Sequence, residues 1–320
     1  MRIAVLGFSS AGRRHAAYLN ELGHEVTVFD PQLEGEPAGV TLVQNPEQAI
    51  RGAEAVVIAS PTSLHASQAS AALQRGRHVL VEKPLAVTAS EGARVAELAE
   101  ANGRVCAVAM NMRFHRAVLE LRRLVESGEL GKILFARVSL GYDLAKWRPE
   151  KDYRMTYSGK AELGGGIILD GIHELDYLVW ILGPVESVSG DIAKVSNLEI
   201  DVEDIALANL RFVGGPLATV ELNYLDQAYR RTCLLVGSAA SARWDWTQAA
   251  ITVTRGGHHD QTMAGDTIDV SFPVDSSYRA EMDDFLAAIA QPGWVPRTTA
   301  RDALEALGLA DAIRQSAADG

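Results

Sequence analysis

Short apolar runs alternate with longer stretches of helical spacing through the first third of this 320-residue chain, and this alternation limits the fold more than any other feature of the sequence. Strands are apolar along their whole length when helices cover both faces of a parallel sheet. The pattern therefore predicts an α/β fold with a doubly wound parallel sheet. We expect strands at Arg2–Leu6, Glu25–Phe29, Ala55–Ala59, His78–Val81 and Val105–Ala109, and helices at Gly12–Leu22, Leu64–Arg75 and Ala89–Asn102.

A different pattern begins after about residue 115. From Val185 to Pro273 apolar and polar residues alternate, with turns at Gly214–Gly215 and Gly256–Gly257, which predicts a large, mostly antiparallel open sheet. We expect one domain at residues 1–115 and an α+β domain at residues 116–320, whose final helices can pack back on the first domain. The other elements expected here are helices at Arg116–Ser127, Asp170–Leu182, Tyr278–Ala290 and Thr299–Ala317, and a strand at Lys132–Gly141.

The composition argues against several classes of protein. A net charge of −11 and a pI near 5.2 give no basic surface for nucleic acid. No apolar run approaches the roughly 18 residues of a membrane span, and no targeting segment precedes the first strand. The two cysteines, Cys106 and Cys233, are far apart and lack the spacing of a zinc site or a disulfide framework. We expect a cytoplasmic protein with reduced thiols and no bound metal.

The turn between the first strand and the first helix, residues 7–12 (GFSSAG), has the character of a dinucleotide-binding turn. Glycines there allow a tight bend, and the helix N-terminus presents backbone N–H groups to a pyrophosphate. Ser9 stands where the pattern G-x-G-x-x-G has its middle glycine, so the motif takes its weight from its place between strand and helix. We expect a Rossmann domain with cofactor contacts from Gly7, Ser9, Ser10, Ala11 and Gly12.

Asp30 ends the second expected strand, at the offset where a carboxylate accepts hydrogen bonds from the adenosine ribose. A carboxylate at this position repels the 2′-phosphate of NADP, so the sequence favours NAD over NADP. The alternative is that Asp30 only opens a turn before Pro31, as Asp-Pro pairs often do.

Two further motifs bring chemistry into this fold. Glu82-Lys83-Pro84 follows the fourth strand, at the carboxyl edge where α/β sheets bind their ligands. The second motif, GGGIILDGIHELDYLVWILG, occupies residues 164–183. Together with the early sequence GFSSAGRRH, the pair Pro61-Thr62 with His65, and NMRFH at residues 111–115, they resemble the glucose-fructose oxidoreductase, inositol dehydrogenase and MocA family.

The resemblance implies a catalytic set of Lys83, Asp170 and His173, with Lys83 toward the nicotinamide. Oxidation of a secondary alcohol needs a base; His173 can accept a proton near neutral pH, and Lys83 can hydrogen-bond the reacting oxygen. The sequence leaves open which of the two accepts the proton. Asp170 would orient the imidazole or hold a sugar hydroxyl. The other cofactor contacts implied by the resemblance are Ser60, Pro61, His65 and Glu82.

Plainer alternatives stand beside this catalytic set. Lys83 by itself is typical of a surface lysine beside a turn, and His173 of a hydrogen-bonded helix histidine. In much of the family four positions separate the aspartate from the histidine, whereas Asp170 and His173 are three apart and would still share a helix face. The stretch DGIHELDY from Asp170 resembles a subgroup associated with nucleotide-sugar or surface-polysaccharide metabolism.

The stretch from Tyr142 to Lys160 is rich in aromatic and charged residues. Aromatic faces stack on sugar C–H surfaces, and arginine binds hydroxyl or anionic groups. The alternative is an exposed inter-domain loop pinned by its aromatic residues. The substrate-binding candidates are Trp147, Arg148, Asp152, Tyr153, Arg154 and Tyr157 from this stretch, and Arg113 from the NMRFH motif.

The leading interpretation is an NAD-dependent oxidoreductase that transfers a hydride between nicotinamide and a secondary hydroxyl or ketone of a sugar, cyclitol or nucleotide sugar. Two alternatives stay open: an NAD-dependent glycosidase that uses transient oxidation, and a non-catalytic NAD-responsive binding protein. Because the expected sheet has few helices to cover it, we also expect a homodimer or homotetramer formed through the C-terminal sheet, unless its own helices cover it. The expected partner is a small sugar-like substrate, and neither nucleic acid nor membrane.

Overall fold

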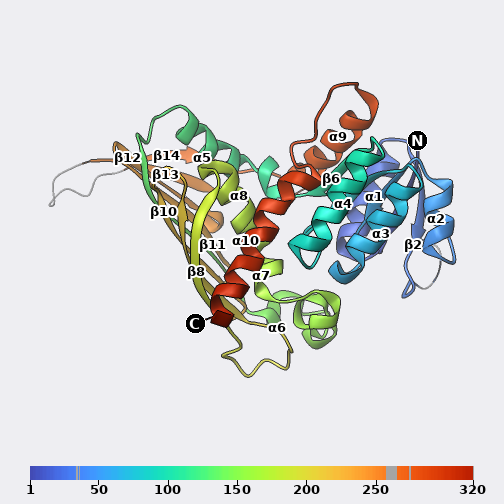
Figure 1. Cartoon of the computed structure of the whole chain (residues 1–320), viewed down its shortest axis with the longest axis horizontal. Helices are drawn as coiled ribbons and strands as arrows, with labels where there is room; N and C mark the ends of the chain where they lie inside the picture. The colour runs from blue at the N-terminus through green and yellow to red at the C-terminus, as the bar shows by residue number, and fades with distance from the viewer. Residues whose placement is uncertain (34, 36, 257–264, 274, 320) are drawn as a thin grey trace. The chain divides into compact units, whose positions relative to one another are not determined.

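The computed structural model describes residues 1–33, 35, 37–256, 265–273 and 275–319, and it divides into two compact units, each with its own sheet (Figure 1). The first unit comprises Met1–Asn111, Glu162–Gly164 and Ser277–Leu307. The second comprises Met112–Ala161, Gly165–Ser276 and the chain from Gly308 onward. The chain therefore enters the first unit three times. The single domain boundary expected at residue 115 stays a prediction.

The sheet of the first unit has six parallel strands in the order β3-β2-β1-β4-β5-β6. The order of the strands reverses between β1 and β4, which is the doubly wound Rossmann arrangement and confirms the expected α/β class. The strands are β1 (Arg2–Leu6), β2 (Glu25–Phe29), β3 (Thr41–Leu42), β4 (Ala55–Ile58), β5 (His78–Glu82) and β6 (Cys106–Ala109). The helices are α1 (Ser10–Glu21), α2 (Pro46–Gly52), α3 (Thr62–Gln74), α4 (Ala89–Ala101) and α9 (Ser276–Ala290).

Both faces of this sheet are buried. Ile3 of β1 belongs to one apolar cluster with Leu19 of α1 and Phe285 of α9. The next residue, Ala4, points to the opposite face and is also fully buried. The continuous apolar strands of the sequence thus reflect cover on two sides, and a helix from near the end of the chain supplies part of that cover.

The sequence pattern does not predict β3 or α2. β3 has two residues, too few to show a period. α2 begins at Pro46 after Asn45, whose side chain accepts a hydrogen bond from the Gln48 N–H at 2.8 Å. Asparagine followed by proline is a usual start of a helix, so a capping signal for α2 was present in the sequence.

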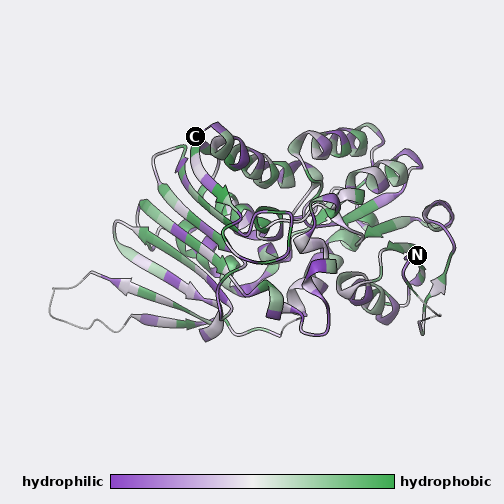
Figure 2. Ribbon diagram, turned by 90° about the horizontal axis from the view of Figure 1, so that it is seen from below, coloured by the Kyte–Doolittle hydropathy of each residue, from purple (hydrophilic) through white to green (hydrophobic). Residues whose placement is uncertain are grey.

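The sheet of the second unit has eight strands in the order β14-β13-β12-β11-β7-β10-β9-β8. β7 and β10 run parallel, and the other neighbouring pairs of described strands are antiparallel, which confirms the expected sheet. Hydropathy alternates along its strands (Figure 2), and in β9 Ala206 and Ala208 are buried while Leu207 is exposed. Residue 257 of the expected Gly256–Gly257 turn lies outside the described residues. The strands are β7 (Ile133–Gly141), β8 (Val185–Ala193), β9 (Ile205–Phe212), β10 (Leu217–Asn223), β11 (Arg230–Gly237), β12 (Ala240–Asp245), β13 (Ala250–Arg255) and β14 (Asp266–Asp269).

The helix expected over Asp170–Leu182 is present as α8 from Ile172, but a break at Gly171 puts Asp170 at the end of a separate helix, α7, so the expectation that Asp170 and His173 share one helix face is wrong. The backbone of Gly171 lies so close to β10 that a Cβ there would come within 3.1 Å of Leu222. None of the helices in the described ranges is long and apolar enough to cross a lipid bilayer. The remaining helices of the chain are α5 (Arg116–Glu126), α6 (Leu144–Trp147), α7 (Ile167–Asp170), α8 (Ile172–Leu182) and α10 (Ala300–Asp319), which runs from the first unit into the second.

Candidate active site

The expected dinucleotide turn requires glycine at two positions. Gly7 has φ +91°, and a Cβ on it would lie 2.5 Å from backbone atoms of Ala59 and Ser60. A Cβ on Gly12 would lie 2.0 Å from the carbonyl oxygen of Gly7. Ser9, which replaces the usual middle glycine, has φ −74° and precedes the first residue of α1. An L-residue adopts this backbone without strain, so the substitution leaves the turn intact.

The N-terminus of α1 lies at this turn, and its first N–H groups, those of Ser10, Ala11 and Gly12, have no acceptor within the helix. The first helical bond runs from the Arg13 N–H to the Ser9 carbonyl at 2.9 Å. Free N–H groups at a helix N-terminus bind phosphate, and the absence of a Cβ at Gly7 and Gly12 leaves room beside them. These residues therefore fit the pyrophosphate of a dinucleotide.

Asp30 follows β2 and connects that strand to the glycine turn. Its Oδ2 accepts a hydrogen bond from the Phe8 N–H at 2.6 Å, and its Oδ1 accepts one from the Gln32 N–H at 2.8 Å. The second bond is the local turn that the sequence offered as an alternative for Asp30. Each carboxylate oxygen keeps a further lone pair, so the turn and a hydroxyl ligand are compatible.

His65 in α3 joins two loops at the same edge of the sheet. Its Nδ1 lies 2.7 Å from the carbonyl oxygen of Pro84, and its Nε2 lies 2.9 Å from that of Ser60. Both ring nitrogens are therefore engaged by backbone. Ser60 in turn donates its hydroxyl to Gln68 at 2.7 Å, and Pro61 precedes the first residue of α3. Of this predicted set, His65 holds the loops in place.

Glu82 and Lys83 lie at the end of β5. The Oε1 of Glu82 is 2.8 Å from Nε2 of His15 in α1, and its Oε2 accepts the Lys83 backbone N–H at 3.3 Å. Burial raises the pKa of Glu82, but the hydrogen bond from His15 and the charges of His15 and Lys83 outweigh it and lower this pKa. Because β1, β2, β4 and β5 are parallel neighbours, the glycine turn, Asp30, Ser60 and Lys83 follow strand ends at one edge.

Asp170, at the end of α7 in the second unit, accepts hydrogen bonds from four hydroxyl groups. The predicted candidate Tyr157 donates to Oδ1 at 2.5 Å. Tyr142, Ser158 and Tyr224 donate to Oδ2 at 2.8, 2.9 and 3.2 Å. Burial and the charge of Asp170 raise the pKa of Tyr142 and of Tyr224, so both stay protonated donors. These three partners were not predicted individually, although Tyr142 begins the expected aromatic stretch.

His173 lies in the first turn of α8 and is buried, and two carboxylates of the same helix pair with arginines. Glu174 contacts Arg231 at 2.7 Å, and Asp176 receives two hydrogen bonds from Arg113, at 2.9 and 2.7 Å. Arg113, a predicted substrate residue, is thus buried in an ion pair. Its role in substrate binding stays a prediction.

The other substrate candidates lie on the surface of the second unit. Trp147 is 45% exposed and stacks on Tyr229 at 5.3 Å between ring centroids. Arg154 pairs with Asp152 at 2.7 Å and with Glu199 at 2.7 Å, and both its carboxylate partners are largely exposed. Tyr153 and Arg148 lie in the same stretch, which forms α6 and 3₁₀ turns at Tyr153–Met155 and Tyr157–Gly159. The ring of Tyr142 lies 4.6 Å from that of Trp147, and the hydroxyls of Tyr142 and Tyr157 both donate to Asp170.

The glycines directly before α7 allow residues 164–166 to pack closely against the backbone of neighbouring residues. A Cβ on Gly165 would lie 2.2 Å from the carbonyl oxygen of Tyr157 and 2.8 Å from that of Ser158. The Gly166 N–H donates to the Ser158 carbonyl at 3.0 Å. Glycine at these positions therefore allows the residues that contact Asp170 to approach it.

Two family descriptions match most of the chain. One, an oxidoreductase family with an NAD-binding Rossmann fold, matches residues 1–110; the other, the GFO/IDH/MocA C-terminal domain, matches residues 118–243. Among curated proteins, scyllo-inositol 2-dehydrogenase (NAD(+)) of Bacillus subtilis strain 168 is 27% identical over 69% of this chain and 66% of its own length. The 1,5-anhydro-D-fructose reductase of Ensifer adhaerens is 31% identical over 66% of this chain and 58% of its own length. The match thus spans about three fifths of those relatives.

Solved structures share the fold over the whole chain. The WlbA dehydrogenase of Bordetella pertussis, in complex with NADH and UDP-GlcNAcA, has a TM-score of 0.83 at 24% identity and covers 100% of this chain and 96% of its own. A levoglucosan dehydrogenase, in complex with NADH and levoglucosan, has a TM-score of 0.87 at 21% identity and covers 100% and 97%.

Proposed function

Because the chain belongs to the GFO/IDH/MocA oxidoreductase family, we propose that it is an NAD-dependent oxidoreductase acting on a secondary hydroxyl, or the corresponding ketone, of a sugar, cyclitol or nucleotide sugar. The observation that carries this proposal is the edge of the first sheet, where the glycine turn, Asp30 and Lys83 follow the ends of neighbouring parallel strands. Relatives named for inositol and anhydrofructose support a polyhydroxylated ring as the substrate class.

The choice of NAD over NADP depends on Asp30. Its two oxygens already order the glycine turn through the Phe8 and Gln32 N–H groups, which leaves lone pairs for ribose hydroxyls and a negative charge against a 2′-phosphate. Bound NAD supplies the hydride acceptor. A much lower KM for NAD than for NADP would support the assignment, and equal values would contradict it.

Lys83 and His173 divide the work on the reacting hydroxyl. Nζ of Lys83 hydrogen-bonds the oxygen and steadies its negative charge, and an imidazole nitrogen of His173 accepts the proton, or the two exchange these roles. A pH profile distinguishes the two assignments, because replacing the proton acceptor removes the acidic limb of kcat.

Asp170 acts on the substrate through the hydroxyls around it. An ionised carboxylate that accepts from Tyr142, Tyr157 and Ser158 fixes the direction of each O–H, and each of these oxygens keeps lone pairs that can accept from a sugar hydroxyl. The predicted role of Asp170 in holding a sugar hydroxyl thereby passes to its tyrosine and serine partners.

The Lys83→Met protein tests the proposal against a panel of sugars, cyclitols and sugar nucleotides, with NADH absorbance as the readout. Methionine keeps the length of the side chain but removes its charge and hydrogen-bond donors, and we expect kcat/KM to fall by at least about 100-fold while NAD binding persists. Lys132→Met, at an exposed lysine of the second unit, is the matched control and should match wild type. No turnover by wild type with any polyol or keto-sugar, in either direction, would sink the proposal.

We further propose a homodimer or homotetramer formed through the outer face of the eight-stranded sheet. Leu207 of β9 and Leu217 of β10 are exposed on the same face of that sheet, and apolar residues on an uncovered face favour burial against a second copy. Light scattering on the purified protein decides this, since a monomeric mass would rule it out. A cytoplasmic location agrees with two buried free thiols, and cell fractionation tests it.

A further inference from the structure

Three ionisable side chains meet inside the first unit. They are His15 of α1, Glu82 at the end of β5 and Glu281 of α9, and their nitrogen and oxygen atoms all lie within 4.8 Å of one another. His15 is 2% exposed and Glu281 3% exposed. Two carboxylates and one histidine at this depth must be neutralised, because a buried unpaired charge is costly.

Glu82 already has partners for both of its oxygens. His15 Nε2 donates to Oε1, since a carboxylate can only accept, and the Lys83 backbone N–H donates to Oε2. This carboxylate therefore ties α1, which starts at the dinucleotide turn, to the backbone of Lys83.

Glu281 is in the opposite situation. Neither of its carboxylate oxygens has a hydrogen-bond partner among the described residues, and both are buried. The charges that act on it are the negative charge of Glu82 and the positive charge of Arg14. Burial, and then the charge of Glu82, raise the pKa of Glu281 well above its usual range, against the effect of Arg14.

A divalent cation is the other way to neutralise two carboxylates. To bind it, His15 would have to offer the lone pair of Nε2. That nitrogen carries a proton instead, because it donates the 2.8 Å hydrogen bond to Glu82. A single proton on Glu281 removes one of the two negative charges and leaves that bond intact.

We propose that Glu281 is a positioning residue that stands beside Glu82 as a neutral carboxylic acid, and so preserves the Glu82 bonds that place Lys83. The catalytic part of this inference rests on the function proposed above. When Glu281 loses its proton as pH rises, a second buried negative charge faces Glu82 and disturbs the placement of Lys83. Among the residues that the structure describes, the titratable and charged groups that face the pair are His15 and Arg14 of α1, Lys83 after β5, His65 of α3 and Tyr278 of α9.

Stability against pH tests the proton without any substrate. The pKa of Glu281 is raised in the folded protein, so its contribution is fully present below the ordinary glutamate value and is lost as pH rises through the folded value. Relative to Glu281→Gln, which is permanently neutral, the wild-type unfolding constant should rise by up to about tenfold per pH unit in that interval. Glu305→Gln, at an exposed glutamate of the same unit, is the control and should follow wild type. Parallel curves for wild type and Glu281→Gln would overturn the proposal.

Infrared spectroscopy gives a second readout that holds even if the variant folds poorly. Wild type at neutral pH should show the carbonyl band of a protonated carboxylic acid, which disappears as pH is raised, and Glu281→Gln should lack it. A metal analysis of the purified wild type that finds one equivalent of a divalent ion, lost in Glu281→Gln, would replace the proton by a cation and refute the proposal.

The activity readout concerns positioning. Wild-type kcat/KM should decline at alkaline pH, and Glu281→Gln should keep its neutral activity while losing that decline, which a merely structural role would not produce. If no substrate is turned over at all, the proposed function fails, whereas the stability and infrared results still decide the state of Glu281.

Discussion

In the second unit the buried carboxylates of Glu174 and Asp176 face arginines, whereas in the first unit the buried carboxylate of Glu281 faces another carboxylate, Glu82. Arginine keeps its charge at every pH that a protein meets, but a carboxyl of raised pKa and a histidine do not. The stability of the ion pairs of α8 should therefore depend little on pH near neutrality. The stability of the cluster of His15, Glu82 and Glu281 depends on whether Glu281 holds its proton. The difference shows two solutions to the same electrostatic cost of burial.

The largest effect should come from breaking a pair that does not titrate. Asp176→Asn leaves the Arg113 charge buried and is expected to lower the free energy of unfolding by about 3–5 kcal/mol. The double variant Arg113→Met, Asp176→Leu removes both charges and should recover most of that loss. Denaturant unfolding followed by tryptophan fluorescence measures it, since Trp180 lies 5.4 Å from Arg113. A loss below about 1 kcal/mol in Asp176→Asn would mean that the pair contributes little, and would free Arg113 for its predicted role with substrate.

A smaller effect is expected from His115 in the second unit. Its contribution to the free energy of unfolding should change with pH in the opposite direction to that of Glu281 in the first unit. Burial, and then the charge of Arg231, lower the pKa of His115 from 6.5 to about 4. A depressed folded pKa means that the contribution of His115 is present above 6.5 and is lost as pH falls through about 4, opposite in direction to Glu281. The loss should reach about 3 kcal/mol below that value.

The matched variant for this test is His115→Asn. Nδ1 of His115 accepts the Ala117 N–H at the start of α5, and asparagine can keep that cap without titrating in this range. The free energy of unfolding is measured near pH 7 and near pH 4.5. The difference between these two values should be smaller in the variant than in wild type. An equal acid loss in wild type and variant would place the sensitivity elsewhere.

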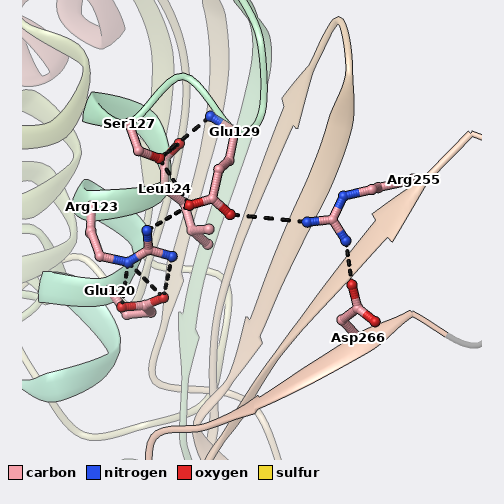
Figure 3. Close-up of polar contacts among 7 residues, drawn as sticks. All are labelled: Glu120, Arg123, Leu124, Ser127, Glu129, Arg255 and Asp266. Atoms are coloured by element: carbon pink, nitrogen blue, oxygen red, sulfur yellow. Dashed lines mark hydrogen bonds and ion pairs between the residues drawn. The ribbon is translucent and has the colours of Figure 1, made fainter.

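The smallest effect is expected where arginine–carboxylate pairing occurs at the surface. Arg123 contacts Glu120 at 2.8 Å and Glu129 at 2.6 Å, and Glu129 approaches Arg255, which pairs with Asp266 (Figure 3). Water and salt screen such groups, so Arg123→Ala should cost less than about 1 kcal/mol, and less still at about 1 M salt. A salt-independent loss above about 2 kcal/mol would show that these contacts, which link α5 and the residues after it to the paired strands β13 and β14, behave like a buried pair.

The sequence predicts the first sheet and the edge proposed to bind the cofactor because both follow from local pattern. Apolar strands with intervening helices specify a parallel sheet, and parallel strands bring Gly7, Asp30 and Lys83 to one edge without knowledge of any distant contact. The other expected helices and strands lie within about two residues of those in the structure.

The partners of the buried charges could not be predicted in the same way. Asp176 is 63 positions from Arg113, and Tyr224 is 54 positions from Asp170, so only the tertiary fold pairs them. From the sequence alone, Arg113 in the NMRFH motif could equally bind a substrate or form an ion pair in the core. Glu281 carries no local signal at all, because its unusual environment is created by Glu82 and His15 from distant segments.

Helix α9 has a consequence for how the protein is made. Its residues Met282 and Phe285 complete the apolar cluster that contains Ile3 and Leu19. Domains often begin to fold as they leave the ribosome, N-terminal part first. Here the nascent first unit emerges with part of one apolar face uncovered until Ser277–Leu307 has been translated. A chain truncated before that point would contain the Rossmann sheet without α9. Such a fragment should require a chaperone or aggregate.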